Sequence, residues 1–203
     1  EWEKPEGVPI SAILFGARRQ KMIPLVYQSF NWQHGTFLGA TLASETTAAA
    51  TGAVGVVRRD PMAMLPFCGY NMGDYFAHWL ALGDAADAAS LPKIFFVNWF
   101  RRDDDGRFLW PGYGENSRVL KWVFERLDGT ADAVKTAIGY LPTLDGLDTE
   151  GLDVSAVDMA ALLSVDTDGW KAALPQFEAH LAQFGDKLPA ELTTQLQRLA
   201  AAL

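Results

Sequence analysis

Two short apolar runs place the strongest limit on how this chain folds. Residues 93–99 read Lys-Ile-Phe-Phe-Val-Asn-Trp, and residues 8–16 form a second run that Gly16 closes. Runs of this length, bounded by turn residues, are typical of buried strands. Residues 23–27 predict another strand, with Pro24 near its start, where a missing N–H donor is tolerated. We therefore expect a mixed α/β fold, with a mixed sheet flanked by helices.

Helical spacing and capping residues predict the helices. Asn71 is expected to cap a helix that continues to Leu82, and Asn116 or Ser117 a second helix that ends near Leu127. The remaining helical candidates are residues 34–46, which fit a helix or a strand equally, residues 167–184, and the segment that begins at Pro189.

The composition changes near Gly129. Most of the aromatic residues and many of the glycines precede it, whereas Ala, Leu and Asp with helix-like spacing follow it. We expect an α/β region over residues 1–128 and a C-terminal helical region over residues 129–203 that packs on it. Residues 144–153, rich in Asp and Gly, are expected to form an irregular connector.

Charge and cysteine content exclude several classes of function. The 203 residues include 25 acidic and 17 basic side chains, a formal net charge of −8. Nucleic acids and anionic membranes need a basic face, so neither is an expected partner. Cys68 is the single cysteine, which rules out a disulfide within the chain and fits a reducing cytoplasm. No apolar run approaches the roughly 20 residues that span a bilayer.

The sequence does not contain a complete active site of a familiar kind. It has no Gly-x-x-x-x-Gly-Lys segment followed by Ser or Thr, and therefore no phosphate-binding loop of that type. His34, His78 and His180 lack neighbouring ligand residues, so we expect no metal site in this chain. Cys68 is expected to be a small buried hydrophobic residue. The first residues, which lack an initiator Met and a signal sequence, read as a cut through a longer polypeptide.

Two segments carry weak indications of ligand binding. Residues 15–19 place Arg18 and Arg19 at the end of an apolar strand, where α/β folds open onto ligand crevices and Arg recognises phosphate. A solvated basic turn is the alternative, and this motif taken alone slightly favours it. Residues 44–55 are mostly small and include two glycines, a composition that suits an active-site lid, a plain surface loop or the frayed end of an Ala-rich helix.

A third segment, residues 98–116, combines aromatic, glycine and amide residues. Its Asp105-Gly106 pair predicts a hairpin between two strands. The rings of Phe100 and Phe108 could stack on a flat heterocycle, and an amide at Asn116 can both donate to and accept from a base edge. An aromatic core cluster is the alternative, although the nearby glycines favour the approach of a ligand.

In colinear order, these segments resemble the GTP-dependent phosphoenolpyruvate carboxykinases. The resemblance covers essentially the whole chain and is carried by residues 5–10, 15–19, 32–35, 59–64, 69–71, 97–100 and 108–118. It implies the C-terminal, nucleotide-binding part of that fold. It also implies an enzyme, a decarboxylating lyase of gluconeogenesis that converts oxaloacetate and GTP into phosphoenolpyruvate, GDP and carbon dioxide.

The resemblance further implies roles for individual residues. Arg19 is expected to contact the terminal phosphates and to stabilise charge during phosphoryl transfer. Residues 47–57 correspond to an Ω-loop lid, which includes Thr47, Ala48, Ala49, Ala50, Thr51 and Gly52. The guanine slot, residues 98–118, is expected to hold the base as follows: Phe100 and Phe108 sandwich it, Tyr113 closes the slot, the backbone of Gly114 and Glu115 lies alongside, and Asn116 reads the base edge.

Two positions depart from the family pattern. Tyr113 stands where the family usually has Phe, and its hydroxyl must find a partner. The lid of the family is usually charged after its alanines, whereas residues 51–54 are neutral here. The energy of lid closure is therefore expected to differ.

Most of the family's catalytic groups are expected to lie outside this chain. These are the phosphate-binding loop with its reactive cysteine, the manganese ligands and the residues that bind oxaloacetate or phosphoenolpyruvate. Mn²⁺, and Mg²⁺ bound to the nucleotide, would then be held by the full-length enzyme. We expect a cytoplasmic, monomeric protein of which this fragment is inactive alone.

Two other classes of function remain open on the residues alone. The seven Trp residues would suit a non-catalytic aromatic-rich binding module, for example for carbohydrate. The second class is a folded interaction domain that has lost its catalytic half. A chain of this class is expected to bind no nucleotide.

Overall fold

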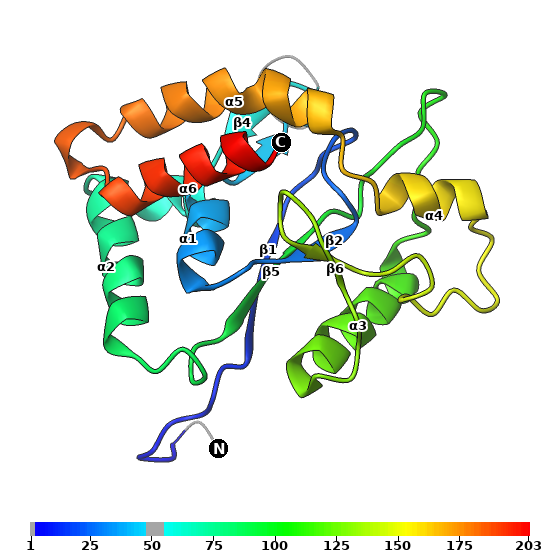
Figure 1. Cartoon of the computed structure of the whole chain (residues 1–203), viewed down its shortest axis with the longest axis horizontal. Coiled ribbons are helices and arrows are strands. Elements are labelled where there is room, and N and C mark those ends of the chain that lie inside the picture. Colours follow the sequence, from blue (N-terminus) through cyan, green and yellow to red (C-terminus); the bar gives the residue numbers. More distant parts are fainter. Residues whose placement is uncertain (1–2, 48–54) are drawn as a thin grey trace.

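The computed structural model describes residues 3–47 and 55–203, which form a sheet covered by helices on both faces (Figure 1). The sheet has five strands in the order β1-β5-β2-β7-β6. β1 and β5 are parallel, and the other neighbouring pairs are antiparallel. The mixed α/β fold expected from the sequence is confirmed. The strands of this sheet are β1 Ala12–Gly16, β2 Val26–Gln28, β5 Lys93–Val97, β6 Val134–Lys135 and β7 Tyr140–Leu141.

Two groups of helices cover the sheet. The first group packs into one hydrophobic cluster and consists of α1 Trp32–Ala40, α2 Met72–Ala85, α5 Thr167–Ala182 and α6 Ala190–Ala202. The second group packs into another cluster and consists of α3 Asn116–Asp128 and α4 Ala156–Leu162. In Figure 1 the first group lies to the left and top of the sheet, and the second lies to the right.

Short elements complete the fold. β3 Ala43–Glu45 and β4 Val57–Arg59 form a separate antiparallel hairpin. Four single turns of 3₁₀ helix also occur in the described residues: η1 Pro61–Ala63, η2 Leu65–Phe67, η3 Tyr113–Glu115 and η4 Gly185–Lys187.

β5 is buried because it divides the two clusters. Its side chains alternate, so that Ile94 and Phe96 pack with the first group of helices while Phe95 and Val97 pack with the second. A strand covered on both faces needs apolar residues at every position, which explains the uninterrupted run in the sequence.

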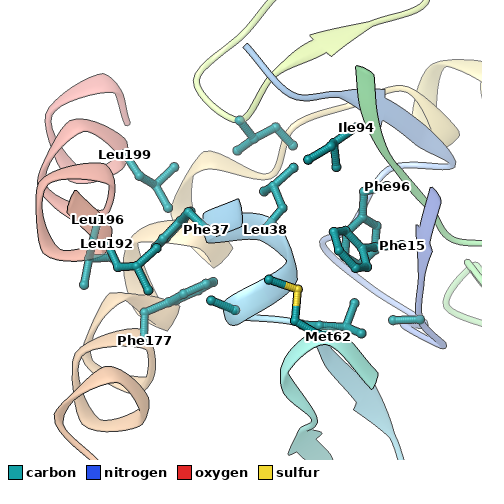
Figure 2. Close-up of a cluster of buried hydrophobic side chains, with 14 of the residues drawn as sticks. Phe15, Phe37, Leu38, Met62, Ile94, Phe96, Phe177, Leu192, Leu196 and Leu199 are labelled. Atoms are coloured by element: carbon teal, nitrogen blue, oxygen red, sulfur yellow. The ribbon is translucent and has the colours of Figure 1, made fainter. Parts of the chain in front are cut away.

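α1 occupies the centre of the first cluster. Figure 2 shows its Phe37 and Leu38 between Phe96 of the sheet and Leu199 of α6. Gly35 allows this helix to lie close to the sheet, because a Cβ atom there would come within 2.7 Å of the Cβ of Ile94.

Most of the expected elements are present, with shifted bounds. The strand predicted at residues 8–16 begins at Ala12, and the one predicted at residues 23–27 begins at Val26. The ambiguous segment 34–46 holds both a helix and a strand. Asn71 caps α2 as predicted, since its side chain accepts a hydrogen bond from the backbone N–H of Gly73.

The segment after residue 128 is not entirely helical. β6 and β7 lie in it and extend the sheet through the pairing of Gln28 with Tyr140. Residues 142–155 contain no helix or strand, which agrees with the irregular connector expected at 144–153. The division of the chain at residue 128 remains a prediction.

Two local predictions are wrong. Neither Asn116 nor Ser117 caps α3, because the Asn116 amide oxygen accepts from Trp110 and the Ser117 hydroxyl donates to the carbonyl of Gly114. The turn at Gly106 does not join two strands: Arg102 and Phe108 form a single β-bridge there.

In the described part of the chain, no helix combines the length and the apolar character that a membrane crossing requires.

Acid should destabilise the fold through His34, which is 6% exposed in α1. Burial lowers the pKa of His34 from 6.5 to about 4, so the ring binds a proton in the unfolded chain before it does in the folded one. Its contribution to stability is therefore full above pH 6.5 and decreases as the pH falls toward 4. We expect a loss of about 2 kcal/mol at pH 5, measured by urea unfolding at pH 7.5 and pH 5. His34→Gln should reduce that difference, whereas exposed His78→Gln should leave it unchanged.

Candidate functional site

The candidate site lies where β1 and β5 end. Because these strands are parallel and Gly16 pairs with Val97, their carboxyl ends meet at one edge of the sheet. The loop after β1 carries Arg18 and Arg19, and the loop after β5 carries Phe100. Ligand crevices of open α/β sheets form at such carboxyl ends.

A buried amide joins the two loops. Asn98, which is 0% exposed, donates from Nδ2 to the carbonyls of Arg19 at 2.8 Å and Ile23 at 2.9 Å. Its Oδ1 accepts from the backbone N–H of Arg19 at 3.1 Å and of Phe100 at 3.3 Å. All four bonding positions of the amide are used, so the arginine loop and the aromatic loop are held as one unit.

The β3–β4 hairpin is fixed to the same arginine loop. The backbone N–H of Glu45 donates to the carbonyl of Arg18 at 2.8 Å, and the Glu45 carboxylate accepts from the N–H of Gln20 at 2.9 Å. The Ser44 hydroxyl accepts from the N–H of Arg18 at 3.0 Å. Three segments that are distant in sequence therefore form one rigid edge.

These segments border an outer cavity of about 270 Å³. Its walls come from the arginine loop, the end of β3 with the residues that follow it, and the aromatic loop. The lining residues are Arg18, Gln20, Glu45, Thr46, Thr47, Phe100, Arg102 and Phe108.

Phe100 and Phe108 lie close to each other at this cavity. Their ring centroids are 6.3 Å apart and the ring planes are tilted by 67°. A base held between two parallel rings needs about 3.5 Å on each side. One ring must therefore rotate to form the expected sandwich, and Phe108, which is 45% exposed, has the room to do so.

Guanidinium groups lie over both rings. The Arg102 guanidinium carbon is 3.9 Å from the centroid of Phe108, and that of Arg18 is 6.0 Å from the centroid of Phe100. Such cation–π contacts contribute about 0.5–1 kcal/mol at exposed sites. The aromatic faces of the cavity are thus covered by positive charge.

The remaining residues of the predicted guanine slot, residues 113–116, are not among those that line the outer cavity. Tyr113 is 99% exposed. Its own backbone is left-handed, with φ 51°. Glu115 accepts from Arg118 at 2.6 Å. Asn116 accepts from the indole N–H of Trp110 at 3.0 Å, which fixes the orientation of the amide because that N–H can only donate. Nδ2 of Asn116 is therefore left as a donor.

Arg19 is less exposed than Arg18. Its side chain is 14% exposed, and its Nε lies 3.7 Å from the Glu45 carboxylate. Burial lowers the pKa of the Arg19 guanidinium, and Glu45 opposes that shift. The side chain lines a second cavity that lies further inside, together with Arg59. The role expected for Arg19 at the phosphates stays a prediction.

The lid expected at residues 47–57 is described only at its ends. Thr47 lines the outer cavity, and the hairpin bonds of Thr46 with Val56 and Gly55 fix its base. The other named lid residues, Ala48 to Gly52, lie outside the described residues.

Sequence reasoning did not assign roles to three groups of this site. Asn98 reads as part of a strand, Glu45 as part of a small-residue loop, and Arg102 as one of several charges near a turn. An amide directly after a buried strand is the one pattern that could have pointed to Asn98.

Across residues 3–47 and 55–203, no group of three His, Cys, Asp or Glu side chains could hold a metal ion.

A crevice at the carboxyl ends of parallel strands, lined by guanidinium groups and aromatic rings, defines a nucleotide-binding α/β domain. The family model described as phosphoenolpyruvate carboxykinase C-terminal P-loop domain matches residues 1–202. The chain therefore belongs to the family of GTP-dependent phosphoenolpyruvate carboxykinases.

Curated relatives support this assignment. Proteins named phosphoenolpyruvate carboxykinase (GTP) from Treponema pallidum and Renibacterium salmoninarum are each 56% identical to it over 98% of its length. The protein of that name from Paenarthrobacter aurescens is 55% identical over 100% of the chain. The chain spans 33% of the length of each of these relatives.

Removing the Asn98 side chain should destabilise the protein strongly. Asn98→Ala leaves two carbonyls and two N–H groups without their partner, and we expect a loss of about 3 kcal/mol or more in the free energy of unfolding. Asn116→Ala, which removes one observed hydrogen bond at a half-buried position, serves as the control. Equal losses in urea unfolding for the two variants would contradict the role assigned to Asn98.

Proposed function

We propose that this chain supplies the guanine nucleotide site of a GTP-dependent phosphoenolpyruvate carboxykinase. The reaction of the whole enzyme would convert oxaloacetate and GTP into phosphoenolpyruvate, GDP and carbon dioxide. Membership of the family supports this proposal. The chain would act with the remaining part of a longer polypeptide and would be inactive by itself.

The outer cavity is the observation that carries the proposal. It brings together Arg18, Thr47, Phe100 and Phe108, which come from the three segments in which the sequence predicts phosphate, lid and base contacts. A surface hollow formed by chance would not be expected to be lined by all three of these segments.

The amide of Asn116 gives the proposed site a preference for guanine. The bond from Trp110 to Oδ1 fixes which way the amide faces, and Nδ2 is left to donate to a base. Guanine presents its O6 acceptor at the edge where adenine presents the N6 donor. GTP and GDP would therefore be favoured over the adenine nucleotides.

The phosphates would lie toward the arginine loop. Arg18 lines the outer cavity, and Arg19, which is positioned by Asn98, would stabilise the charge of the transferred phosphoryl group. Residues 47–57 would close over the reacting groups from the fixed end of the β3–β4 hairpin. Tyr113 and the backbone of Gly114 and Glu115 would complete the base site.

Other properties of the whole enzyme are proposed on the family resemblance alone. Mn²⁺, and Mg²⁺ with the nucleotide, would be held outside the described residues, and so would oxaloacetate or phosphoenolpyruvate. The protein would be cytoplasmic and monomeric. Residues 1–128 would form the nucleotide-binding region, and residues 129–203 would pack on it.

A fluorescence titration tests the nucleotide site. We expect saturable quenching of tryptophan emission by GDP and weaker quenching by ADP. Phe108→Ala removes a stacking ring that is already 45% exposed, so it should weaken GDP binding about tenfold or more without unfolding the chain. Phe67→Ala, at a ring that is 82% exposed and does not line the cavity, is the matched control. A folded protein indifferent to both nucleotides, in the intact polypeptide as well, would contradict the proposal.

Base selectivity is tested by Asn116→Asp. The carboxylate keeps an acceptor for Trp110 but lacks the amide donor, so the fold should persist while GDP binding weakens about tenfold or more. ADP binding should change less, because the adenine amino group can donate to the carboxylate. Unchanged discrimination between GDP and ADP, measured by the same titration, would show that Asn116 does not read the base.

A further inference from the structure

A second, inner cavity lies behind the arginine loop, between the sheet and the first group of helices. Its volume is about 30 Å³. Figure 2 shows some of its apolar walls, where Phe37, Leu38, Phe96, Phe177 and Leu199 converge. Its polar lining residues are Arg19, Tyr27, His34, Thr41, Arg59 and Trp170.

The inner cavity has more positive than negative charge around it. Arg19 and Arg59 both line it, and Glu45 lies 3.7 Å from Arg19. Arg59 stacks on Phe177 at 4.1 Å and donates to the carbonyl of Thr41 at 2.6 Å, but it forms no ion pair with a carboxylate within the described residues. One positive charge is therefore left without a negative partner.

The charge of Arg19 affects the ionisation of Arg59. Burial lowers the pKa of Arg59 to about 10, and the positive charge of Arg19 adds to that shift. Two cations held near each other in a poorly hydrated place favour the uptake of a negative charge.

The unsatisfied groups of the lining residues are donors. Arg19 Nε and the indole N–H of Trp170, which is 4% exposed, are buried without a hydrogen-bond partner in the part of the chain that is described. His34 adds a further N–H: its Nδ1 accepts from the backbone of Phe30, which leaves the proton of the neutral ring on Nε2. These donors need an acceptor.

We propose that the inner cavity binds one monovalent halide ion, with chloride as the natural occupant. A single negative charge balances the surplus charge of Arg59, and an ion without protons accepts from every donor. The volume fits a monatomic anion and is too small for sulfate or a phosphate group. The apolar walls suit a weakly hydrated ion.

Water is the competing occupant. A cavity of this size has room for one or two water molecules, which would satisfy the donors. Water would leave the charge of the two guanidinium groups uncompensated, and each molecule would need acceptors for its own hydrogens. The test must therefore separate an ion from water.

Crystals of the protein grown without chloride and soaked in sodium bromide provide the direct test. We expect an anomalous bromine peak inside the inner cavity, within contact distance of Arg59 and Trp170. A cavity without that peak, or with bromine only at the protein surface, would overturn the proposal.

Thermal unfolding gives an independent measurement in solution. At constant ionic strength, Tm should rise by several degrees as chloride or bromide replaces gluconate, because a ligand that binds the folded state stabilises it. Trp170→Phe removes one donor and should lessen this dependence.

Trp122→Phe is the matched control. Trp122 is 1% exposed, and its indole N–H also has no partner among the described residues, but it packs in the second cluster and does not line the inner cavity. The halide dependence of its Tm should equal that of the unmodified protein. The same Tm in chloride and gluconate, or an equal loss of halide dependence in both variants, would refute the site.

Discussion

The four hydrogen bonds of Asn98 are the interaction on which the site depends. Parallel strands end at the same edge, and the loops that leave them no longer pair with each other. Their backbone groups would stay unsatisfied in the interior, at a cost of about 1–3 kcal/mol each. The Asn98 amide supplies donors to the carbonyls of Arg19 and Ile23, and an acceptor to two N–H groups. The loop with the arginines and the loop with the aromatic rings consequently keep a fixed separation.

The sequence predicted those elements that a local pattern of neighbouring residues is enough to define. β5 is apolar on both faces, and the cap of α2 depends on two neighbouring residues, so local patterns were enough. α1 was ambiguous because eight of its nine residues are buried and no polar face marks the helical period.

The candidate site was identified through the family resemblance, and its geometry was outside the reach of local patterns. Asn116 looked like a helix cap because caps are recognised by residue type. Its actual partner, Trp110, depends on the path of the intervening loop, where Gly112 and Tyr113 both have left-handed backbones. The tilt of Phe100 against Phe108 and the contact of Arg102 with Phe108 depend on side-chain packing between segments.

The distribution of charge explains how such a site can exchange its contacts for a nucleotide. The chain has a net charge of −8, yet Arg18 and Arg102 lie over aromatic rings at the outer cavity and pair with no carboxylate of residues 3–47 and 55–203. A cation–π contact of about 0.5–1 kcal/mol is weaker than a charge-assisted hydrogen bond, which contributes about 1.5–3 kcal/mol. An anionic phosphate can therefore draw these guanidinium groups away from the rings at a net gain. The same movement uncovers the ring faces on which a base would stack, so that phosphate binding and base binding favour each other.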